Sequence, residues 1–247
     1  MLKLIVNGDD FGLCAAVNQG IRLAHDGGVL TSTTVMVNAA QPEEVLLAST
    51  ENPRLGMGIH LNTTFGCPIL PNHQVASLVD AEGKFLCPEQ MPLVQVPELE
   101  KEWRAQIERF LSWGIKPDHL DSHHHVHAIP RFWPVVAQLA RELDVPVRQI
   151  NQEMKIYLQE QGIRTTDYFI ETFYGPGVRL EELTHQLSCI HEGVVELMCH
   201  PAIAESSLAQ ISSYNDPRHR ELGILTSLEL RQWLMQEGIE LINFTQY

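Results

Sequence analysis

The sequence predicts an α/β fold, a single-domain, irregular (β/α) barrel of seven or eight mainly parallel strands. Short runs rich in Val, Ile and Thr alternate with longer segments of helical period, which is typical of successive β/α units. The chain of 247 residues has the length of one such domain, and no linker interrupts it. An open, doubly wound sheet would also fit, but the number of repeats favours the barrel.

The predicted elements alternate along the chain. Strands are expected at residues 2–7, 31–38, 55–61, 119–124, 145–150, 168–172, 194–199 and 239–243. Helices, with apolar residues three or four positions apart, are expected at 15–26, 42–49, 98–113, 132–143, 180–190 and 227–237. Residues 63–96 carry many Pro, Gly and polar residues without a sustained period, so we expect a long loop excursion inside the single domain 1–247.

Composition and charge make several partners and locations unfavourable. The 17 Lys and Arg against 31 Asp and Glu give a formal charge of −14, which disfavours nucleic acid and anionic lipid surfaces. No apolar run approaches the roughly 20 residues that cross a bilayer, and residues 1–6 resemble a strand more than an export signal. The five cysteines form no CxxC pair, which indicates free thiols. We therefore expect a cytoplasmic protein.

Polar residues follow the predicted strands. Asp9 and Asp10 come after the first strand, His60 ends the third, and His200 follows the strand that ends at Cys199. The carboxyl ends of parallel strands share one edge, where ligands and catalytic groups gather. Asp9 and Asp10 could cap a helix, but one Asp would suffice for that. Two adjacent carboxylates repel each other, and a cation is a usual relief.

Histidines are concentrated at the end of the fourth strand. Residues 121–127 read Asp-Ser-His-His-His-Val-His, which places four of the twelve histidines within five positions. On a strand, alternate residues share a face, so Asp121, His123 and His125 should point the same way. Metal binding is the commonest joint use of so many imidazoles. The segment therefore predicts a metal site.

Five motifs now allow a comparison with a known family. In chain order they are Asn7-Gly8-Asp9-Asp10-Phe11-Gly12, Thr31-Ser32-Thr33-Thr34, Gly58-Ile59-His60-Leu61, Leu120-Asp121-Ser122-His123-His124-His125-Val126-His127 and Met198-Cys199-His200-Pro201. Together they resemble the motifs of YdjC-like carbohydrate deacetylases, a family that includes chitooligosaccharide deacetylases. The resemblance runs to about Leu228. It implies a (β/α) barrel, a divalent metal ion, an N-acetylated mono- or oligosaccharide as substrate, and a homodimer.

The resemblance also implies roles for single residues. Asp10, His60 and His123 look like the metal ligands. Asp9 looks like the catalytic base, and His200 like the acid on the opposite side of the site. The family usually has Ala where this chain has Gly8, and it differs at residues 62–64; these departures touch the floor of the site and leave the ligand set intact.

The expected chemistry explains why these groups would be needed. Hydrolysis of an acetamide needs a stronger nucleophile than neutral water and a proton for the departing amine. One divalent ion can supply the first. Two imidazoles and a carboxylate suit Zn²⁺, Mn²⁺ or Co²⁺, whereas the family is commonly described with Mg²⁺. His125 is the alternative ligand to His123, and Asp121 could instead accept a ring N–H.

Substrate recognition is less specific in the sequence. Arg148 ends a predicted strand and could bind a sugar hydroxyl or the acetyl carbonyl. Phe65, Phe173 and Tyr174 lie in predicted loops and could offer apolar faces to a sugar. Two other functions remain open: another metallohydrolase such as a phosphoesterase, and a non-catalytic sugar-binding regulator. The phosphoesterase is disfavoured because the sequence near the motifs has no Lys/Arg set and no Gly-rich loop that could hold phosphate. The second is disfavoured because every proposed catalytic position is filled.

Overall fold

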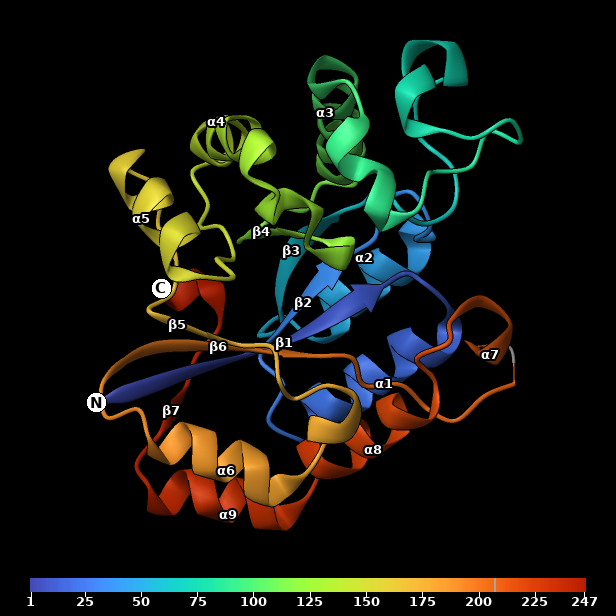
Figure 1. Ribbon diagram of the computed structural model, residues 1–247. Coiled ribbons are helices and arrows are strands. Elements are labelled where there is room, and N and C mark those ends of the chain that lie inside the picture. Colours follow the sequence, from blue (N-terminus) through green and yellow to red (C-terminus); the bar gives the residue numbers. More distant parts are fainter. Residues whose placement is uncertain (207) are drawn as a thin grey trace.

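The strand β1 (Leu2–Phe11) is the centre of the fold, since three other strands pair with it. The computed structural model describes residues 1–206 and 208–247 and contains a parallel sheet in the order β4-β3-β2-β1-β6-β5, with β7 paired to the start of β1 (Figure 1). The other strands are β2 (Ser32–Val35), β3 (Gly56–Leu61), β4 (Leu120–Ser122), β5 (Tyr168–Ile170), β6 (Gly193–Cys199) and β7 (Glu240–Leu241). The sheet curls into an incomplete, irregular (β/α) barrel, which confirms the predicted fold class.

Helices surround this sheet (Figure 1). They are α1 (Ala15–Asp26), α2 (Pro42–Glu51), α3 (Val96–Ser112), α4 (Trp133–Leu143), α5 (Gln152–Glu160), α6 (Leu180–Ser188), α7 (Leu208–Ile211), α8 (Asp216–Leu225) and α9 (Leu228–Gln236). α1 packs beside α8, and α6 packs beside α9. Among the helices of the described residues, none combines the length and the apolar character that a membrane span requires.

The register of β1 brings distant residues to one edge. Gly8 lies opposite Thr33 of β2 on one side and Cys199 of β6 on the other. From Leu4 onward β1 is buried on both faces, as expected for a parallel strand covered by helices on one side and filling the barrel on the other. The carboxyl ends of β1, β2 and β6 therefore lie side by side.

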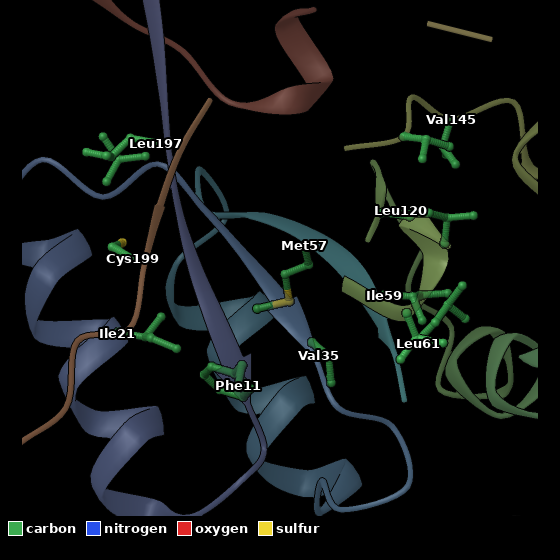
Figure 2. Packing of buried hydrophobic residues seen from close by; sticks show 14 of the residues in the cluster. Phe11, Ile21, Val35, Met57, Ile59, Leu61, Leu120, Val145, Leu197 and Cys199 are labelled. Carbon is green, nitrogen blue, oxygen red and sulfur yellow. The ribbon is translucent and has the colours of Figure 1, made fainter. Parts of the chain in front are cut away.

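The core lies between the sheet and the helices (Figure 2). Ile21 of α1 and Phe11 of β1 belong to the same hydrophobic cluster, and both are fully buried. Gly20 lets α1 approach the segment that follows β6, because an added Cβ there would lie 2.4 Å from the Cα of Ala202. Ile203 N donates to Ala16 O at 3.1 Å in the same contact. α1 therefore fixes the path of the chain just after His200.

The stretch at 63–96 is irregular, as predicted. Before α3 begins it forms three short 3₁₀ helices, Asn72–Gln74, Ala76–Leu78 and Pro88–Leu93, and one isolated antiparallel bridge between Val79 and Phe85. The buried carboxylate of Glu102 in α3 accepts hydrogen bonds from the backbone N–H groups of Ile69 and Leu70, at 2.9 and 3.1 Å. The excursion is thus anchored to α3 by its own backbone.

The strand predicted at 145–150 is wrong. Only one bridge forms there, between Leu120 and Val147. Pro146 has no N–H and cannot continue a ladder, although its carbonyl accepts from Leu120 N at 3.0 Å. Val147 N donates in turn to Arg164 O at 3.0 Å, so this segment links β4 to the chain that enters β5. The helices α5, α7 and α8 were not predicted.

The strand predicted at 119–124 is shorter than expected. β4 ends at Ser122, and a 3₁₀ segment (His123–Ala128) follows. Within it His124 and His125 have left-handed backbones, each with φ of 52°. The prediction that Asp121, His123 and His125 share one strand face is therefore wrong, because strand alternation stops before the histidines begin.

Candidate active site

A cavity of about 470 Å³ opens at the carboxyl ends of the strands. Its polar lining comes from β1, β3, the segment after β4, the segment after β6 and α8, and includes Asp9, Asp10, His60, His123, His125, His200 and Arg218. Phe65, Tyr174, Ile211 and Tyr214 contribute aromatic and apolar surface. The fold thus gathers residues that are up to about two hundred positions apart in the sequence.

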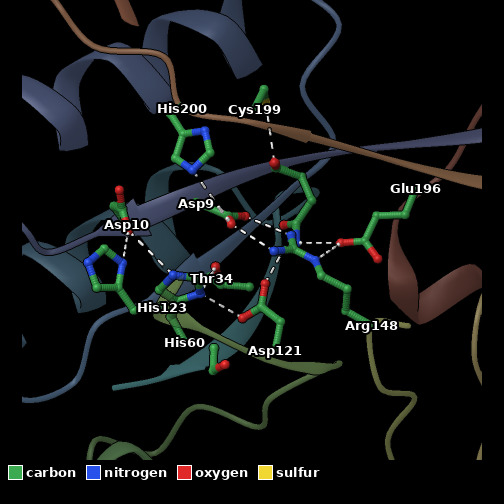
Figure 3. A network of polar contacts seen from close by, with 12 residues as sticks. Asp9, Asp10, Thr34, His60, Asp121, His123, Arg148, Glu196, Cys199 and His200 are labelled. Carbon is green, nitrogen blue, oxygen red and sulfur yellow. Dashed lines mark hydrogen bonds and ion pairs between the residues drawn. The ribbon is translucent and has the colours of Figure 1, made fainter. Parts of the chain in front are cut away.

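Asp10, His60 and His123 lie close together in the cavity (Figure 3). His60 Nε2 lies 3.4 Å from Asp10 Oδ1, and His123 Nδ1 lies 3.0 Å from the same oxygen. One donor atom from each residue falls within 4.8 Å of the other two. The spacing is short enough for the three groups to contact one ion.

The backbone of β1 is unusual at this point. Asp10 has φ of 72°, and the pairing with β2 shifts register between Gly8 and Phe11. Asp is among the few residue types that tolerate the left-handed region. The bend gives the two adjacent carboxylates different partners, since Asp9 pairs with Arg148 and Asp10 with Arg218. Asp10 therefore sits in a conformation of the kind that proteins retain at functional sites.

The donor set fits a divalent cation. Among the described residues, the nearest donors to the buried Asp10 Oδ1 are the ring nitrogens of His60 and His123, but neither makes a well-aligned hydrogen bond to it. Burial of such an oxygen is costly unless a positive charge completes the site. His60 Nδ1 donates to Asp121 Oδ1 at 2.7 Å, which leaves Nε2 directed at Asp10. A ligating histidine commonly donates its second N–H to a carboxylate in this manner. Asp121 thus orients His60.

The charges around His60 also favour a cation at this site. Burial alone would lower the pKa of His60, but Asp121, Asp10 and Asp9 together raise it to about 10. The carboxylates therefore make the site strongly attractive to positive charge. Asp9, His60 and Asp121 also come within ligand distance of one another, but there Arg148 already supplies the positive charge.

His125 lies apart from the three candidate ligands. It lines the cavity but belongs to neither group of residues spaced for a metal ion. Its ring packs edge-on against Phe169, with centroids 5.8 Å apart. Burial lowers the pKa of His125 to about 4, so the imidazole is neutral. Of the two histidines that the sequence left as alternatives, the geometry favours His123.

Arg148 has surroundings different from those expected. Its side chain is fully buried and does not line the cavity. It donates to both oxygens of Asp9 at 2.7 Å each and to Glu196 at 2.7 Å, and it lies 3.0 Å from Asp121 (Figure 3). Burial alone would raise the pKa of Asp9, but the Arg148 guanidinium holds it below the ordinary value. Arg148 therefore orients an ionised Asp9, and the substrate contact proposed for it finds no support.

His200 approaches Asp9 from the end of β6. Its Nε2 lies 3.9 Å from Asp9 Oδ2, and its backbone N–H donates to Glu221 of α8. Burial lowers the pKa of His200 to about 3. The imidazole is thus neutral at rest, so it must take up a proton before it can give one to a leaving group.

Arg218 is a site residue that the sequence did not reveal. Its NH2 group donates to Asp10 Oδ2 at 2.6 Å, and its Nε donates to Tyr214 O at 2.9 Å. The Asp216-Pro217 pair is a recognisable helix start, because Pro suits the first turn. That signal could have predicted α8, but nothing local indicates that Arg218 reaches β1.

The three aromatic candidates separate into two kinds. Phe65 and Tyr174 line the cavity, with Phe65 edge-on to His123 at a centroid distance of 6.2 Å. Phe173 is 1% exposed and belongs to the core, so the sugar-facing role considered for it is wrong. Alternate residues of an extended segment point in opposite directions, which explains why adjacent Phe173 and Tyr174 differ.

Comparison with known proteins identifies the family. Residues 3–236 match the family described as YdjC-like protein. The chain belongs to the YdjC-like family. A curated relative of Brevibacillus brevis, named carbohydrate deacetylase, is 42% identical over 251 residues and covers 99% of both chains. One of Clostridium beijerinckii with the same name is 41% identical over 248 residues, covering 98% of this chain and 99% of its own.

A solved structure shares the fold of this YdjC-like chain. It comes from Enterococcus faecalis V583 and was provisionally described as a cellobiose-phosphate cleavage protein. The two chains are 39% identical, with a TM-score of 0.93 and coverage of 99% of this chain and 98% of the other. The family resemblance drawn from the five motifs is therefore confirmed over nearly the whole YdjC-like chain.

Proposed function

We propose that the protein is a divalent-metal-dependent hydrolase that removes acetyl groups from N-acetylated sugars such as chitooligosaccharides. The observation that carries the proposal is an ionised Asp9 beside the Asp10, His60 and His123 group at the floor of one cavity. The relatives named carbohydrate deacetylase support the class of substrate. The cavity volume is also in the range of sites that enclose a small molecule.

Asp10, His60 and His123 would hold one divalent ion. The family resemblance favours Mg²⁺, while two imidazoles and a carboxylate suit Zn²⁺, Mn²⁺ or Co²⁺. When bound, the cation supplies Lewis acidity, which polarises the acetyl carbonyl and makes water a stronger nucleophile. Asp121 keeps His60 in the tautomer that presents Nε2, and Arg218 holds the second oxygen of Asp10.

Asp9 would act as the general base. Its carboxylate is held by two hydrogen bonds from Arg148, so it stays ionised and cannot rotate freely. It accepts a proton from the water whose oxygen forms the new bond to the acetyl carbon. Arg148 also pairs with Asp121 and Glu196, so its charge is shared among three carboxylates.

His200 would act as the general acid. The C–N bond of the acetamide breaks as the nitrogen takes a proton, so one proton passes overall from water to the departing amine. His200 Nε2 lies 3.9 Å from Asp9, close enough to receive the proton that Asp9 has accepted once groups adjust in the substrate complex. Its low pKa makes the imidazolium a strong acid toward the amine.

The test is an acetate-release assay on metal-free protein supplied with Zn²⁺, Mn²⁺, Co²⁺ or Mg²⁺ in turn. Chitooligosaccharides and other N-acetylglucosamine compounds are the substrates, and phosphate release from sugar phosphates is measured in parallel. Acetate release that depends on a metal supports the proposal. Phosphate release alone would indicate a phosphoesterase, and tight sugar binding without turnover would indicate a regulator; either result would overturn it.

We further propose that the enzyme acts in the cytoplasm as a homodimer. The five cysteines all lie in the described residues and are free thiols, which suits a reducing compartment. The dimer rests on the family resemblance alone. Light scattering coupled to gel filtration measures the mass directly, and a single species near the monomer mass of 27.9 kDa would contradict the dimer.

A further inference from the structure

Two stacked tyrosines form one wall of the cavity. The rings of Tyr174 and Tyr214 are parallel within 6°, with centroids 3.9 Å apart, and both residues line the cavity. Tyr174 follows β5 and Tyr214 precedes α8, so the fold brings them together from 40 positions apart. Tyr174 is 44% exposed although Tyr214 covers one of its faces. The exposed part of the Tyr174 ring is therefore available to a ligand.

The stacked pair is held firmly. The Tyr214 hydroxyl accepts a hydrogen bond from Gly175 N at 2.9 Å and donates to Glu221. Arg218 Nε donates to the Tyr214 carbonyl oxygen at 2.9 Å. These contacts join the segment after β5 to α8. A preorganised aromatic surface loses little conformational entropy when a ligand binds to it.

The same hydrogen-bond network holds His200. The two carboxylate oxygens of Glu221 accept from the Tyr214 hydroxyl and from the His200 backbone N–H. The His200 ring lies edge-on to Tyr174, with centroids 5.5 Å apart and planes at 71°. The His200 ring is also edge-on to Tyr214, with centroids 5.7 Å apart, so it lies beside the stacked pair. A group that takes a proton from His200 therefore lies close to the ring of Tyr174.

The chemistry of the substrate then places a sugar ring there. The acetamido nitrogen is bonded directly to a carbon of the pyranose, so a nitrogen within reach of His200 brings its ring beside His200 as well. One face of a pyranose presents mainly C–H groups, which match the apolar face of an aromatic ring. Phe65 lies instead beside His123 and so faces the candidate metal ligands.

We infer that Tyr174 is the surface on which the acetamido-bearing pyranose stacks, with Tyr214 as its support. The inference rests on the proposed function, because it takes His200 as the group that protonates the sugar nitrogen. It assigns the ring of Tyr174, and not its hydroxyl, to substrate binding. It also makes Tyr214 and Glu221 positioning residues that hold the sugar surface and the acid in one arrangement.

The kinetic test uses N,N′-diacetylchitobiose. Tyr174→Ala should raise KM about 3- to 10-fold, the range expected for loss of one stacking interaction, and Tyr174→Phe should keep KM near normal because the ring remains. Tyr168→Ala is the matched control: Tyr168 is also 44% exposed but lies outside this cavity, so KM should not change. An unchanged KM in Tyr174→Ala, or an equal rise in Tyr174→Phe, would overturn the inference.

A binding measurement separates this inference from the proposed reaction. Calorimetric titration of the same sugar into metal-free protein needs no turnover, and Kd should rise in Tyr174→Ala by the same 3- to 10-fold. If the sugar binds but no acetate is ever released, the proposed reaction fails while the change in Kd still decides the role of Tyr174. An equal Kd in both proteins, or no binding to the unmodified protein, would overturn the inference. Tyr174→Leu removes the ring but keeps an apolar side chain, so it replaces Tyr174→Ala if thermal melting shows that the Ala variant is misfolded.

Discussion

At the scale of single residues, the proposed ion would depend on both imidazoles, because Asp10, His60 and His123 each place one ligand atom within 4.8 Å of the other two. We propose one divalent ion per protomer, and His60→Ala should abolish most of this metal occupancy. A carboxylate and one imidazole leave the coordination too incomplete for tight binding. Elemental analysis after dialysis measures the loss. His73→Ala, which changes an exposed histidine of the excursion, should keep the ion. Full metal occupancy in His60→Ala would remove His60 from the ligand set.

Asp9 gives a second prediction at this scale, because its role differs from that of its neighbour. Asp9→Asn should keep the metal but lower turnover by at least about 100-fold, since an amide cannot accept the proton from water. Arg148 remains paired with Asp121 and Glu196 in this variant, so the site should stay intact. Initial rates of acetate release at equal metal content test this. Near-normal rates would transfer the role of base to another group.

At the scale of elements, the contact between α1 and the segment after β6 decides where His200 lies. Gly20→Ala should destabilise the protein by about 1–3 kcal/mol and lower turnover, because the new Cβ would meet the backbone of Ala202 and displace the segment after His200. Metal content should be unchanged. Urea unfolding and acetate release measure the two effects.

Gly223→Ala is the matched control for that variant. Gly223 lies in α8, and an added Cβ there meets nothing within 4 Å. Ala favours a helix over Gly by up to about 1 kcal/mol, so this variant should be as stable as the unmodified protein or slightly more stable. Equal behaviour of the two variants would show that close packing at Gly20 is not what places His200.

The elements also show what a sequence of this kind can predict. β1 and α3 could be predicted because each carries a clear pattern, a short apolar run at residues 4–6 in β1 and an amphipathic period in α3. The buried residues of α8 include Arg218 and Glu221, so the apolar period that would predict a helix is weak. At 145–150 the β-branched residues predict a strand, but Pro146 prevents the ladder.

In the candidate site, too, some residues could be predicted from local sequence patterns and others could not. Asp9, Asp10, His60, His123 and His200 could be identified because each lies at the carboxyl end of a strand or just after it, and parallel strands end at one edge. Arg218 and Tyr214 reach the cavity, and Glu221 supports it by accepting from the Tyr214 hydroxyl and the His200 backbone N–H. These are tertiary contacts of α8 and the chain before it, which no local pattern encodes. Arg148 was identified, but its partners Asp9, Asp121 and Glu196 depend on the curling of the sheet.

At the scale of the whole molecule, buried histidines link stability to pH. Burial lowers the pKa of His127 to about 3, against an ordinary value of 6.5. Between these values the unfolded chain binds the proton and the folded protein does not, so the contribution of His127 is present above pH 6.5 and is lost as the pH falls toward 3. The contribution of Glu221 to stability depends on pH in the opposite direction: burial raises its pKa to about 8, so stability is lost as the pH rises toward 8.

A variant isolates the contribution of His127 from the others. His127→Gln should reduce the dependence of the unfolding free energy on pH by about 1.4 kcal/mol per pH unit between pH 4 and 6, equivalent to one proton. Urea unfolding of metal-free protein at several pH values gives the slopes. The variant also loses hydrogen bonds to Ser122 and to the Arg148 carbonyl, which lowers stability at every pH but leaves the slope unaffected. Identical slopes would contradict a neutral His127.

The central position of β1 has a consequence for synthesis on the ribosome. Its partner β6 begins at Gly193, so about 190 residues must be translated after β1 before that edge can be paired. At roughly 5–20 residues per second, the nascent chain carries an unpaired, apolar edge for about 10–40 seconds. Chains arrested before residue 193 should be readily cleaved by protease and retained by chaperones, whereas chains arrested after the last residues have left the exit tunnel should resist cleavage. The first strand to be synthesised is thus among the last to be fully paired. The yield of folded protein therefore depends on how long chaperones keep the edge of β1 from aggregating.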